Sequence, residues 1–411
     1  MSGTGKETIW TPNFIMVILF TFLSYAAAFL TYPLVAKFSL SLNPDLTLAS
    51  TIAGLMSLAS LFVCPFAGVL SDRVSRKRIL QLSSVCYGAV LAMHAFIRSI
   101  PALIVLRLLV GVFFSVNNVT AVAYSTDFIP EKRMGEGLGY AALATILAQA
   151  IGPALGLKLV DIGGYPLVFA AAAVSVFLCA AVITFLPGRK PSGAVSGKIT
   201  MDSLAVITFL PGRKPSGAVS GKISMDSLMA VEFTGFMILA ALFAAGSGLI
   251  STFLAIMGEE RNITNIALYF TVYSACMVFL RPLVGKLLDK KGVYVIVAPA
   301  VLFTAVGTAM IGFAHTLVMV VAAAVLIAIG QGAGTPSLQA DVIRHLDRSR
   351  TGVATSTIQI GQNIGNAIAP VIGSFFVGSY GYAGMFSGYG VLLTVAGWLI
   401  LFLHYRRDNK H

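Results

Sequence analysis

Long apolar runs of about 20 residues, separated by short polar segments, make up most of the chain. The apolar positions are continuous and do not alternate with period two, so the pattern predicts helices and not the strands of a barrel. A helix of about 20 residues is long enough to cross a bilayer. We predict twelve membrane-spanning helices, at residues 14–36, 49–71, 79–97, 101–125, 136–158, 165–187, 229–257, 264–287, 293–313, 316–340, 350–377 and 382–404.

The composition agrees with a membrane location. Of the 411 residues, 57% are hydrophobic and 11% are charged, whereas a soluble domain has roughly 25% charged residues. With a mean hydropathy of +0.89, the chain is predicted to be an all-α membrane protein. No secretory signal peptide is evident, so the first apolar run is expected to be retained as a helix. The four cysteines have no paired spacing and are interpreted as small apolar residues of helices: Cys64, Cys86, Cys179 and Cys276.

The basic residues indicate an orientation in the membrane. The net charge of +12 comes from cations in short loops beside the predicted helices, which argues against nucleic acid as a partner. With the N-terminus taken as cytoplasmic, 23 of the 28 Lys and Arg residues fall on the cytoplasmic side, four fall on the far side, and Arg107 lies inside a helix. Cytoplasmic loops of membrane proteins are enriched in Lys and Arg. The distribution therefore predicts both termini in the cytoplasm and an even number of helices.

One polar segment occurs twice in the chain. Gly68-Val-Leu-Ser-Asp-Arg-Val-Ser-Arg-Lys-Arg78 lies between two apolar runs, and a weaker copy, Gly285-Lys-Leu-Leu-Asp-Lys-Lys-Gly292, follows far downstream. The spacing from Asp72 to Asp289, here called the repeat offset, also relates Gly152-Pro-Ala-Leu-Gly156 to Ala369-Pro-Val-Ile-Gly373. One offset across separated segments predicts two six-helix halves in the same orientation.

A second repeat is nearly identical and in tandem. Ala181–Leu204 recurs as Ala205–Leu228, with differences only at Thr200 and Ser224, which indicates a recent duplication. The apolar part of the second copy is too short to span a membrane. We therefore predict an N-terminal half at 1–187, a cytoplasmic linker at 188–228 and a C-terminal half at 229–411. The alternative is that the second copy ends the sixth helix and shifts its register by the length of one copy.

The segment beginning at Gly68, its degenerate copy and the two parallel halves together resemble the major facilitator superfamily of transporters. The resemblance implies a fold whose halves rock about a central cavity. It also implies a latch in which Asp72 approaches the start of the eleventh helix and Arg76 pairs with Asp127. The family usually has glycine in place of Ser75, so serine is expected to strain or reshape that turn. The residues expected in the latch are Gly68, Asp72, Arg73, Arg76, Asp127 and Asp289.

The motif Gly152-Pro-x-x-Gly156 in the fifth helix resembles a motif of the drug:proton antiporter branch of this family. Proline is expected to bend the helices and glycine to let them approach closely, at Gly152, Pro153, Gly156 and Pro370. The sugar-porter signature that would follow the sixth helix is absent. Export is therefore favoured over import.

Two residues are candidates for proton coupling. Arg107 lies about 9 Å into its helix at 1.5 Å per residue, and it resembles the arginine linked to coupling in this branch; the alternative is that it snorkels to the outer surface. No carboxylate lies deep in a predicted helix. Glu232, just inside the seventh helix, is the best candidate for a proton carrier, and a position at the cytoplasmic end is equally open. Coupling is thus implied by the resemblance alone.

Polar residues in apolar helices need partners, so some are expected to line the substrate cavity and others to join helices. The cavity candidates are Tyr32, Asn117, Asn118, Gln149, Gln331, Gln362 and Asn366.

The sequence thus predicts a monomeric secondary transporter of the bacterial inner membrane, which exports a small organic compound against an inward flow of protons. An exporter or importer of metabolites or metallophores is the alternative within the same fold. A membrane receptor or a channel without coupled transport is the alternative in another class. Phosphate-loop, metalloprotease and hydrolase motifs are absent from the sequence, so no enzymatic activity, cofactor or metal is expected.

Overall fold

A computed structural model of the chain describes residues 9–130, 133–187, 231–345 and 351–408. In these ranges the chain is almost entirely helical and contains no strand. The helices are α1 (Pro12–Thr31), α2 (Leu34–Leu42), α3 (Leu46–Arg73), α4 (Arg76–His94), α5 (Ile100–Thr126), α6 (Met134–Thr184), the short 3-10 helix η2 (Val231–Phe233), α9 (Thr234–Glu260), α10 (Leu268–Gly312), α11 (Leu317–His345) and α12 (Thr351–Asp408).

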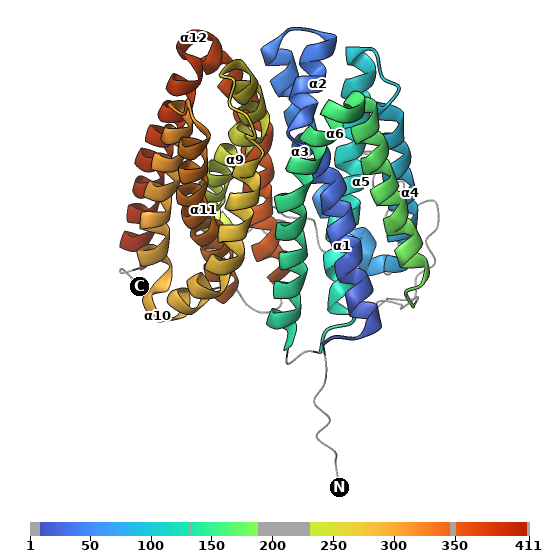
Figure 1. Ribbon diagram of the computed structural model, residues 1–411. Helices are drawn as coiled ribbons and strands as arrows, with labels where there is room; N and C mark the ends of the chain where they lie inside the picture. Colours follow the sequence, from blue (N-terminus) through green and yellow to red (C-terminus); the bar gives the residue numbers. More distant parts are fainter. Residues whose placement is uncertain (1–8, 131–132, 188–230, 346–350, 409–411) are drawn as a thin grey trace, which may run out of the picture.

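Three of these helices turn back on themselves at a glycine. Gly164 in α6, Gly292 in α10 and Gly381 in α12 have φ values of 69°, 76° and 66°, in a region that glycine enters without the steric penalty of a Cβ. Each of the three helices therefore forms two crossings of the bundle (Figure 1). With α1 and α2 as a single crossing, the described helices form the twelve crossings that the sequence predicts.

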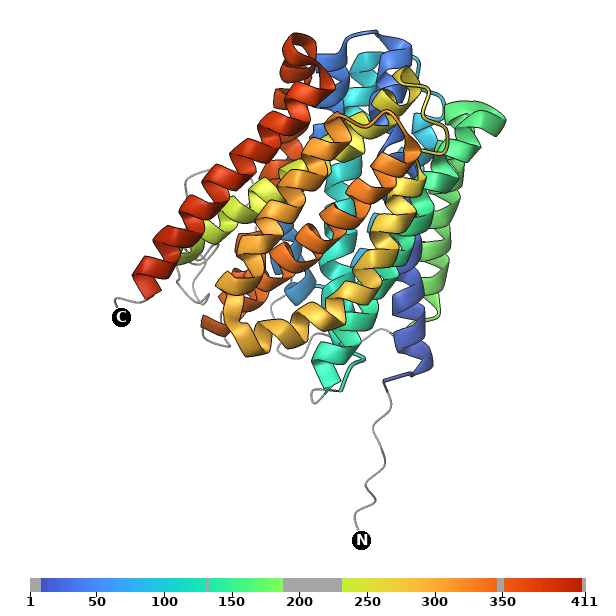
Figure 2. The ribbon, with the colours of Figure 1, turned by 60° about the vertical axis from the view of Figure 1, so that its left-hand side comes forward.

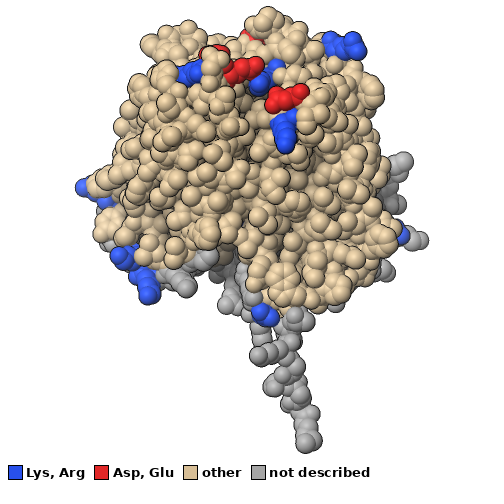
Figure 3. All heavy atoms as spheres, viewed as in Figure 1, with Lys and Arg blue, Asp and Glu red and all other residues tan. Residues whose placement is uncertain are grey.

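The surface has the character of a membrane protein. Eight helical stretches are long and apolar enough to cross a bilayer by length and composition alone. Large side chains such as Phe62, Phe279 and Val318 are 65–78% exposed, which is favourable only where lipid replaces water. On the face in Figure 3, charged atoms gather near the upper end and along the lower margin, and the area between them is uncharged.

The crossings form two bundles, one of α1–α6 and one of α9–α12 (Figures 1 and 2). In the first, α1 packs on α6 and α3 on α5; in the second, α9 packs on α12 and α10 on α11. Between the bundles, α3 lies against α12 and α6 against α10. The turn glycines Gly164 and Gly381 are themselves related by the repeat offset. This relation and the order of the helices are those of a parallel repeat.

The two copies of the repeated polar segment turn differently. Gly292, with its positive φ, corresponds to Ser75 at the repeat offset. Ser75 has φ −55° and ψ 113°, and Val74 before it has φ −113° and ψ 156°. The turn between α3 and α4 therefore has two residues with negative φ, so of the two effects expected of Ser75 the structure has the reshaped turn and not the strained one.

The sixth crossing ends in the first copy of the tandem duplication. α6 ends at Thr184, and Ile183 and Leu186 are buried against residues of α1 such as Val17 and Phe20. The alternative register, in which the second copy ends this crossing, is thus not adopted. The predicted linker 188–228 lies outside the described residues, and the boundaries of the two halves stay a prediction.

The two ends of the bundle differ in how the halves meet. α1 begins and α12 ends at one end, here called the terminal end, and the opposite end is the far end (Figure 1). At the far end, Lys37 of α2 and Glu259 of α9 form an ion pair of 2.6 Å that joins the halves. Closer to the middle of the bundle, Gly54 of α3 lies directly against the backbone of Ala367 in α12. Figure 3 shows the molecule hollowed between the halves at the terminal end.

Candidate functional site

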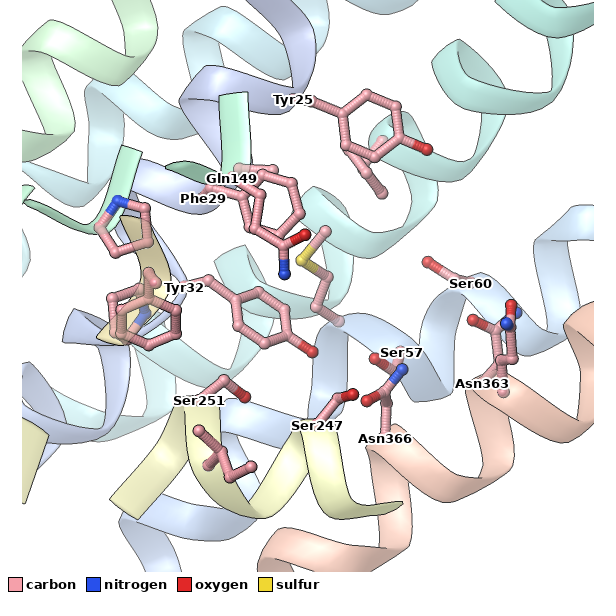
Figure 4. A pocket seen from close by; sticks show the side chains of 18 of the residues that line it. Tyr25, Phe29, Tyr32, Ser57, Ser60, Gln149, Ser247, Ser251, Asn363 and Asn366 are labelled. Carbon is pink, nitrogen blue, oxygen red and sulfur yellow. The ribbon is translucent and has the colours of Figure 1, made fainter. Parts of the chain in front are cut away.

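A cavity of about 310 Å³ lies between the two bundles. Both halves build it, through α1, α3, α5 and α6 on one side and α9, α10, α11 and α12 on the other (Figure 4). The lining consists of Tyr25, Ala28, Phe29, Tyr32, Pro33, Met56, Ser57, Ser60, Phe114, Asn118, Gln149, Pro153, Ser247, Ile250, Ser251, Tyr269, Phe270, Tyr273, Gln331, Gln359, Gln362, Asn363 and Asn366.

The described lining contains no Asp, Glu, Lys, Arg or His. Its polar groups are the hydroxyls of serine and tyrosine and the amides of asparagine and glutamine, set among aromatic rings. An apolar wall with a few hydrogen-bonding groups is the usual chemistry of a site for small organic molecules. A cargo of net charge would enter without a counter-ion here, which is costly in a low-dielectric interior.

Aromatic side chains form the wall on the side of the first half. The hydroxyl of Tyr25 donates to Oδ1 of Asn118 over 2.7 Å. The ring of Tyr25 stacks on Phe29 and meets Phe114 edge to face, with centroid distances of 6.0 and 5.5 Å. Tyr32, at the junction of α1 and α2, also lines the cavity. These contacts fix the rings, so the first half offers a shaped apolar surface.

Tyr32 lies where the two halves meet. Its ring points toward Ser57 of α3 and Ser251 of α9 (Figure 4). Its hydroxyl therefore lies between polar groups of both halves. A movement of one half against the other would separate Tyr32 from one of these serines.

Gln331 of α11 organises the wall of the second half. Its Oε1 accepts from Ser247 of α9 and from Tyr273 of α10, both over 2.9 Å. Its Nε2 donates to the carbonyl oxygen of Phe243 over 3.3 Å. Gln331 is 6% exposed, so its amide mainly joins α9, α10 and α11 at the wall of the cavity.

The sequence model of the Major Facilitator Superfamily matches residues 17–245 and again residues 236–411. The chain belongs to the Major Facilitator Superfamily. The two matches agree with the parallel repeat of the fold, and the chain is therefore a transporter and not an enzyme.

Relatives of this superfamily member span almost its whole length. It is 25% identical over 401 residues to the multidrug resistance protein MdtG of Proteus mirabilis, covering 94% of each chain. It is 23% identical over 397 residues to an MFS-type transporter of Methanocaldococcus jannaschii, covering 96% of this chain and 98% of that one. Among solved structures, it shares its fold with a POT family transporter, with a TM-score of 0.76, 16% identity and coverage of 96% of both chains.

Six of the seven cavity candidates line the cavity of this transporter: Tyr32, Asn118, Gln149, Gln331, Gln362 and Asn366. Asn117 does not. Its side chain is fully buried, and its Oδ1 accepts hydrogen bonds from Ser83 and Ser84 of α4. The expectation that Asn117 lines the cavity is therefore wrong. Asn117 joins α4 to α5.

Several lining residues were missed by the sequence reasoning. Gln359 and Asn363 each stand three residues before a candidate, Gln362 and Asn366, and this spacing places all four on one face of a helix. This spacing is visible in the sequence and could have predicted that Gln359 and Asn363 also line the cavity. The serines Ser57 and Ser251 gave no such signal, because serine is common at helix contacts in membranes.

Arg107 lies inside the first bundle and does not line the cavity. It is 1% exposed, so it does not snorkel to the surface. Its Nη2 lies 3.5 Å from the carbonyl oxygen of Ala53, and its Nε has no hydrogen-bond partner in the described chain. The hydroxyl of Tyr87 and Nε2 of His94, both buried in the same bundle, also have no such partner. A buried cation with so few partners is costly, which makes a functional role the default hypothesis for Arg107.

Glu232 lies at the surface, in η2 before α9. The side chain is exposed, and its backbone oxygen accepts from Arg407 over 3.1 Å. The sequence left open whether Glu232 lies inside the seventh helix or at its end. In the structure it lies at the end of that helix. A role in proton coupling for Glu232 and Arg107 stays a prediction.

The expected pair of the latch is present at the terminal end. Nη1 of Arg76 lies 2.6 Å from Oδ1 of Asp127, and it also donates to the carbonyl oxygen of Ala123. Nε of Arg76 donates to the carbonyl oxygen of Ser71 over 3.2 Å. Both charged side chains are largely buried, with exposed fractions of 13% and 19%. The pair fixes the turn between α3 and α4 against α5.

The structure says less about the other residues expected in the latch. Asp72, Arg73 and Asp289 lie in helices, but their side chains are outside the described part of the structure. A Cβ at Gly68 would meet nothing within 4 Å, so no close contact requires glycine there. The latch as a device that closes the terminal end stays a prediction.

The glycines of the motif in α6 allow a close approach to α1. A Cβ at Gly152 would lie 2.7 Å from Cβ of Phe29, and one at Gly156 would overlap the carbonyl oxygen of Leu30. The helix continues through Pro153, and α12 is equally continuous through Pro370. The motif thus packs α6 closely on α1, as expected for its glycines, and a bending role of the prolines stays a prediction.

Proposed function

We propose that this transporter exports a small, uncharged or weakly polar organic compound by alternating access, driven by an inward flow of protons. The observation that carries the proposal is the uncharged cavity walled by both halves. Contacts between the halves at the far end and a hollow at the terminal end are what one of two alternating conformations requires (Figure 3).

The direction of transport is taken from the relatives. The name of the Proteus mirabilis relative assigns it to multidrug resistance, and the match extends over nearly all of both chains. Export of an organic compound is the function that carries over most directly. The lining of aromatic, hydroxyl and amide groups supports a cargo of this kind.

The orientation and the coupling belong to the same proposal. Basic residues such as Arg76 and Lys77 lie at the terminal end, which supports a cytoplasmic location for both termini and an inner-membrane protein. Arg107 is the proposed coupling residue, because it is a buried cation away from the cavity. Glu232 is the second candidate. The cavity is complete within one chain, which supports a monomer.

Purified protein in liposomes tests the proposal. Vesicles that contain the protein and have an acidic interior should accumulate chloramphenicol, which carries no net charge, faster than protein-free vesicles, and an uncoupler should abolish the difference. Flux that is unaffected by the uncoupler would contradict proton coupling but not export. The variant Arg107→Gln should bind cargo like the parent and lose the dependence on the pH gradient. If chloramphenicol does not move in any vesicle, the proposed export is wrong.

A further inference from the structure

We infer that one face of α12 is the polar half of the cargo site and selects uncharged molecules with a hydrogen-bonding edge. This inference rests on the proposed function and names the substrate class of the same cavity. The face, here called the amide stripe, consists of Gln359, Gln362, Asn363 and Asn366.

The amide stripe is continuous along the helix. The four positions are separated by three, one and three residues, so they lie on one side of α12 over about 10 Å at 1.5 Å per residue. All four line the cavity. Figure 4 shows Asn363 and Asn366 directed into it, on the side of Ser57 and Ser60.

The amides of the stripe have no partners. The described structure gives none of the four side chains a hydrogen bond or an ion pair. Asn363 is only 9% exposed. The other three side chains are partly exposed to the cavity, so the stripe offers its hydrogen-bonding groups to whatever occupies the cavity, and buried polar groups such as Asn363 are normally hydrogen-bonded. Gln331 in the same cavity shows the contrast, because both ends of its amide are bonded within the protein.

The fold does not require amides at these positions. At the repeat offset, the equivalent face of α6 consists of Ala142, Thr145, Ile146 and Gln149. Ile146 is 2% exposed and is packed into the core of the other half. Only Gln149 is an amide. The same face of the same crossing is thus mainly a packing surface in one half and an unpartnered polar surface in the other, which points to a role in binding.

The aromatic rings in the rest of the lining define the remainder of the cargo. Phe29, Phe114 and Phe270 present apolar rings to the cavity, and no charged group lines it in the described chain. A molecule that fits has donors and acceptors along one edge, a planar or apolar opposite face and no net charge. A cation or an anion would meet neutral amides and rings without a counter-charge.

Three aromatic probes that differ in net charge test the charge selection. We expect chloramphenicol, an uncharged amide with a nitrophenyl ring, to bind the purified full-length protein at least about tenfold more tightly than the tetraphenylphosphonium cation or the 2-naphthoate anion, as measured by calorimetry. Equal affinities, tighter binding of either ion, or no binding of chloramphenicol would overturn the inference.

Near-isosteric variants test the stripe itself. Gln362→Met and Asn363→Leu remove one amide each and should raise the Kd of chloramphenicol about 3- to 10-fold, the range of one hydrogen bond. Asn363→Gln keeps an amide and should lose less affinity than Asn363→Leu. Thr145→Val changes the equivalent face of α6 and should leave the Kd unchanged. Thermal melting of each variant separates loss of binding from loss of folding.

The outcomes also separate this inference from the proposed function. Stripe-dependent binding of chloramphenicol without transport would support the inference and contradict export. Transport of all three probes with unchanged affinity in Gln362→Met and Asn363→Leu would support export. That result would show instead that the amides serve contacts between helices in another conformation, and the inference would be wrong.

Discussion

Replacing Gly54 with alanine tests whether the contact of α3 with α12 holds the far end closed. A Cβ at Gly54 would overlap the carbonyl oxygen of Ala367 and lie 3.2 Å from its carbon. Carbon atoms in ordinary contact are about 3.5–4.0 Å apart. The obstacle is helix backbone, so no side-chain rotation relieves it. The two halves must separate at this point for alanine to fit.

The size of the effect follows from the geometry. Overpacking by one methyl group costs about 1–3 kcal/mol. Alanine also gains about 0.5–1 kcal/mol over glycine within a helix. That gain applies to both conformations and cancels in the equilibrium between them, whereas the overlap exists only where Gly54 meets Ala367. Because about 1.4 kcal/mol is a factor of ten, the ratio of closed to open far ends should fall about 5- to 150-fold.

Spin labels measure this ratio directly. Labels at Asn43 and Thr264, exposed residues at the far ends of the two halves, report the distance between the halves when the native cysteines are replaced. Gly54→Ala should enlarge the long-distance population in lipid nanodiscs. Gly378→Ala on α12 is the matched control, because a Cβ there meets nothing within 4 Å. Equal distance distributions for the two variants would refute the role given to this contact.

Three further changes have smaller or different effects. Lys37→Ala should shift the same distribution less than about fivefold, because Glu259 is 68% exposed and such pairs contribute about 0.2–1 kcal/mol; exchanging the two charges should restore the parent distribution, and failure to do so would contradict the pair. Asp127→Asn removes the ion pair of the largely buried Arg76 and should lower the free energy of unfolding by about 1.5–3 kcal/mol, measured by denaturant titration against Asp127→Glu; an unchanged midpoint would count against it. Gly292→Ala places a Cβ at φ 76° and should cost about 1–2 kcal/mol in the same titration; a neutral result would mean that the turn relaxes.

Much of the fold could be predicted from the sequence, because it depends on patterns along the chain. The length of the apolar runs predicts the crossings, and the repeat offset predicts the two halves. The cavity depends on direction around each helix, which a uniformly apolar helix does not reveal. Asn117 and Asn118 are adjacent in α5, yet one bonds to α4 and the other lines the cavity. The approach of Gly54 to Ala367 is between halves and has no signal in either segment alone.

The two halves have in common an amide residue four positions before a proline, and they differ at the neighbouring positions of the same helix face. Pro153 has no N–H, so the carbonyl of Gln149 receives no helical bond from four residues ahead, and Pro370 has the same effect on Asn366. The repeat offset relates the two pairs, and both amides line the cavity. Each half thus places in the cavity one amide residue whose backbone carbonyl lacks its helical hydrogen bond, as expected of a duplicated unit. Beyond these positions the halves separate in role, since Ile146 on α6 is packed into the second half while the amide stripe of α12 remains open. We therefore expect substitutions along α12 to change which cargo is bound, and those along the same face of α6 to change how the halves move.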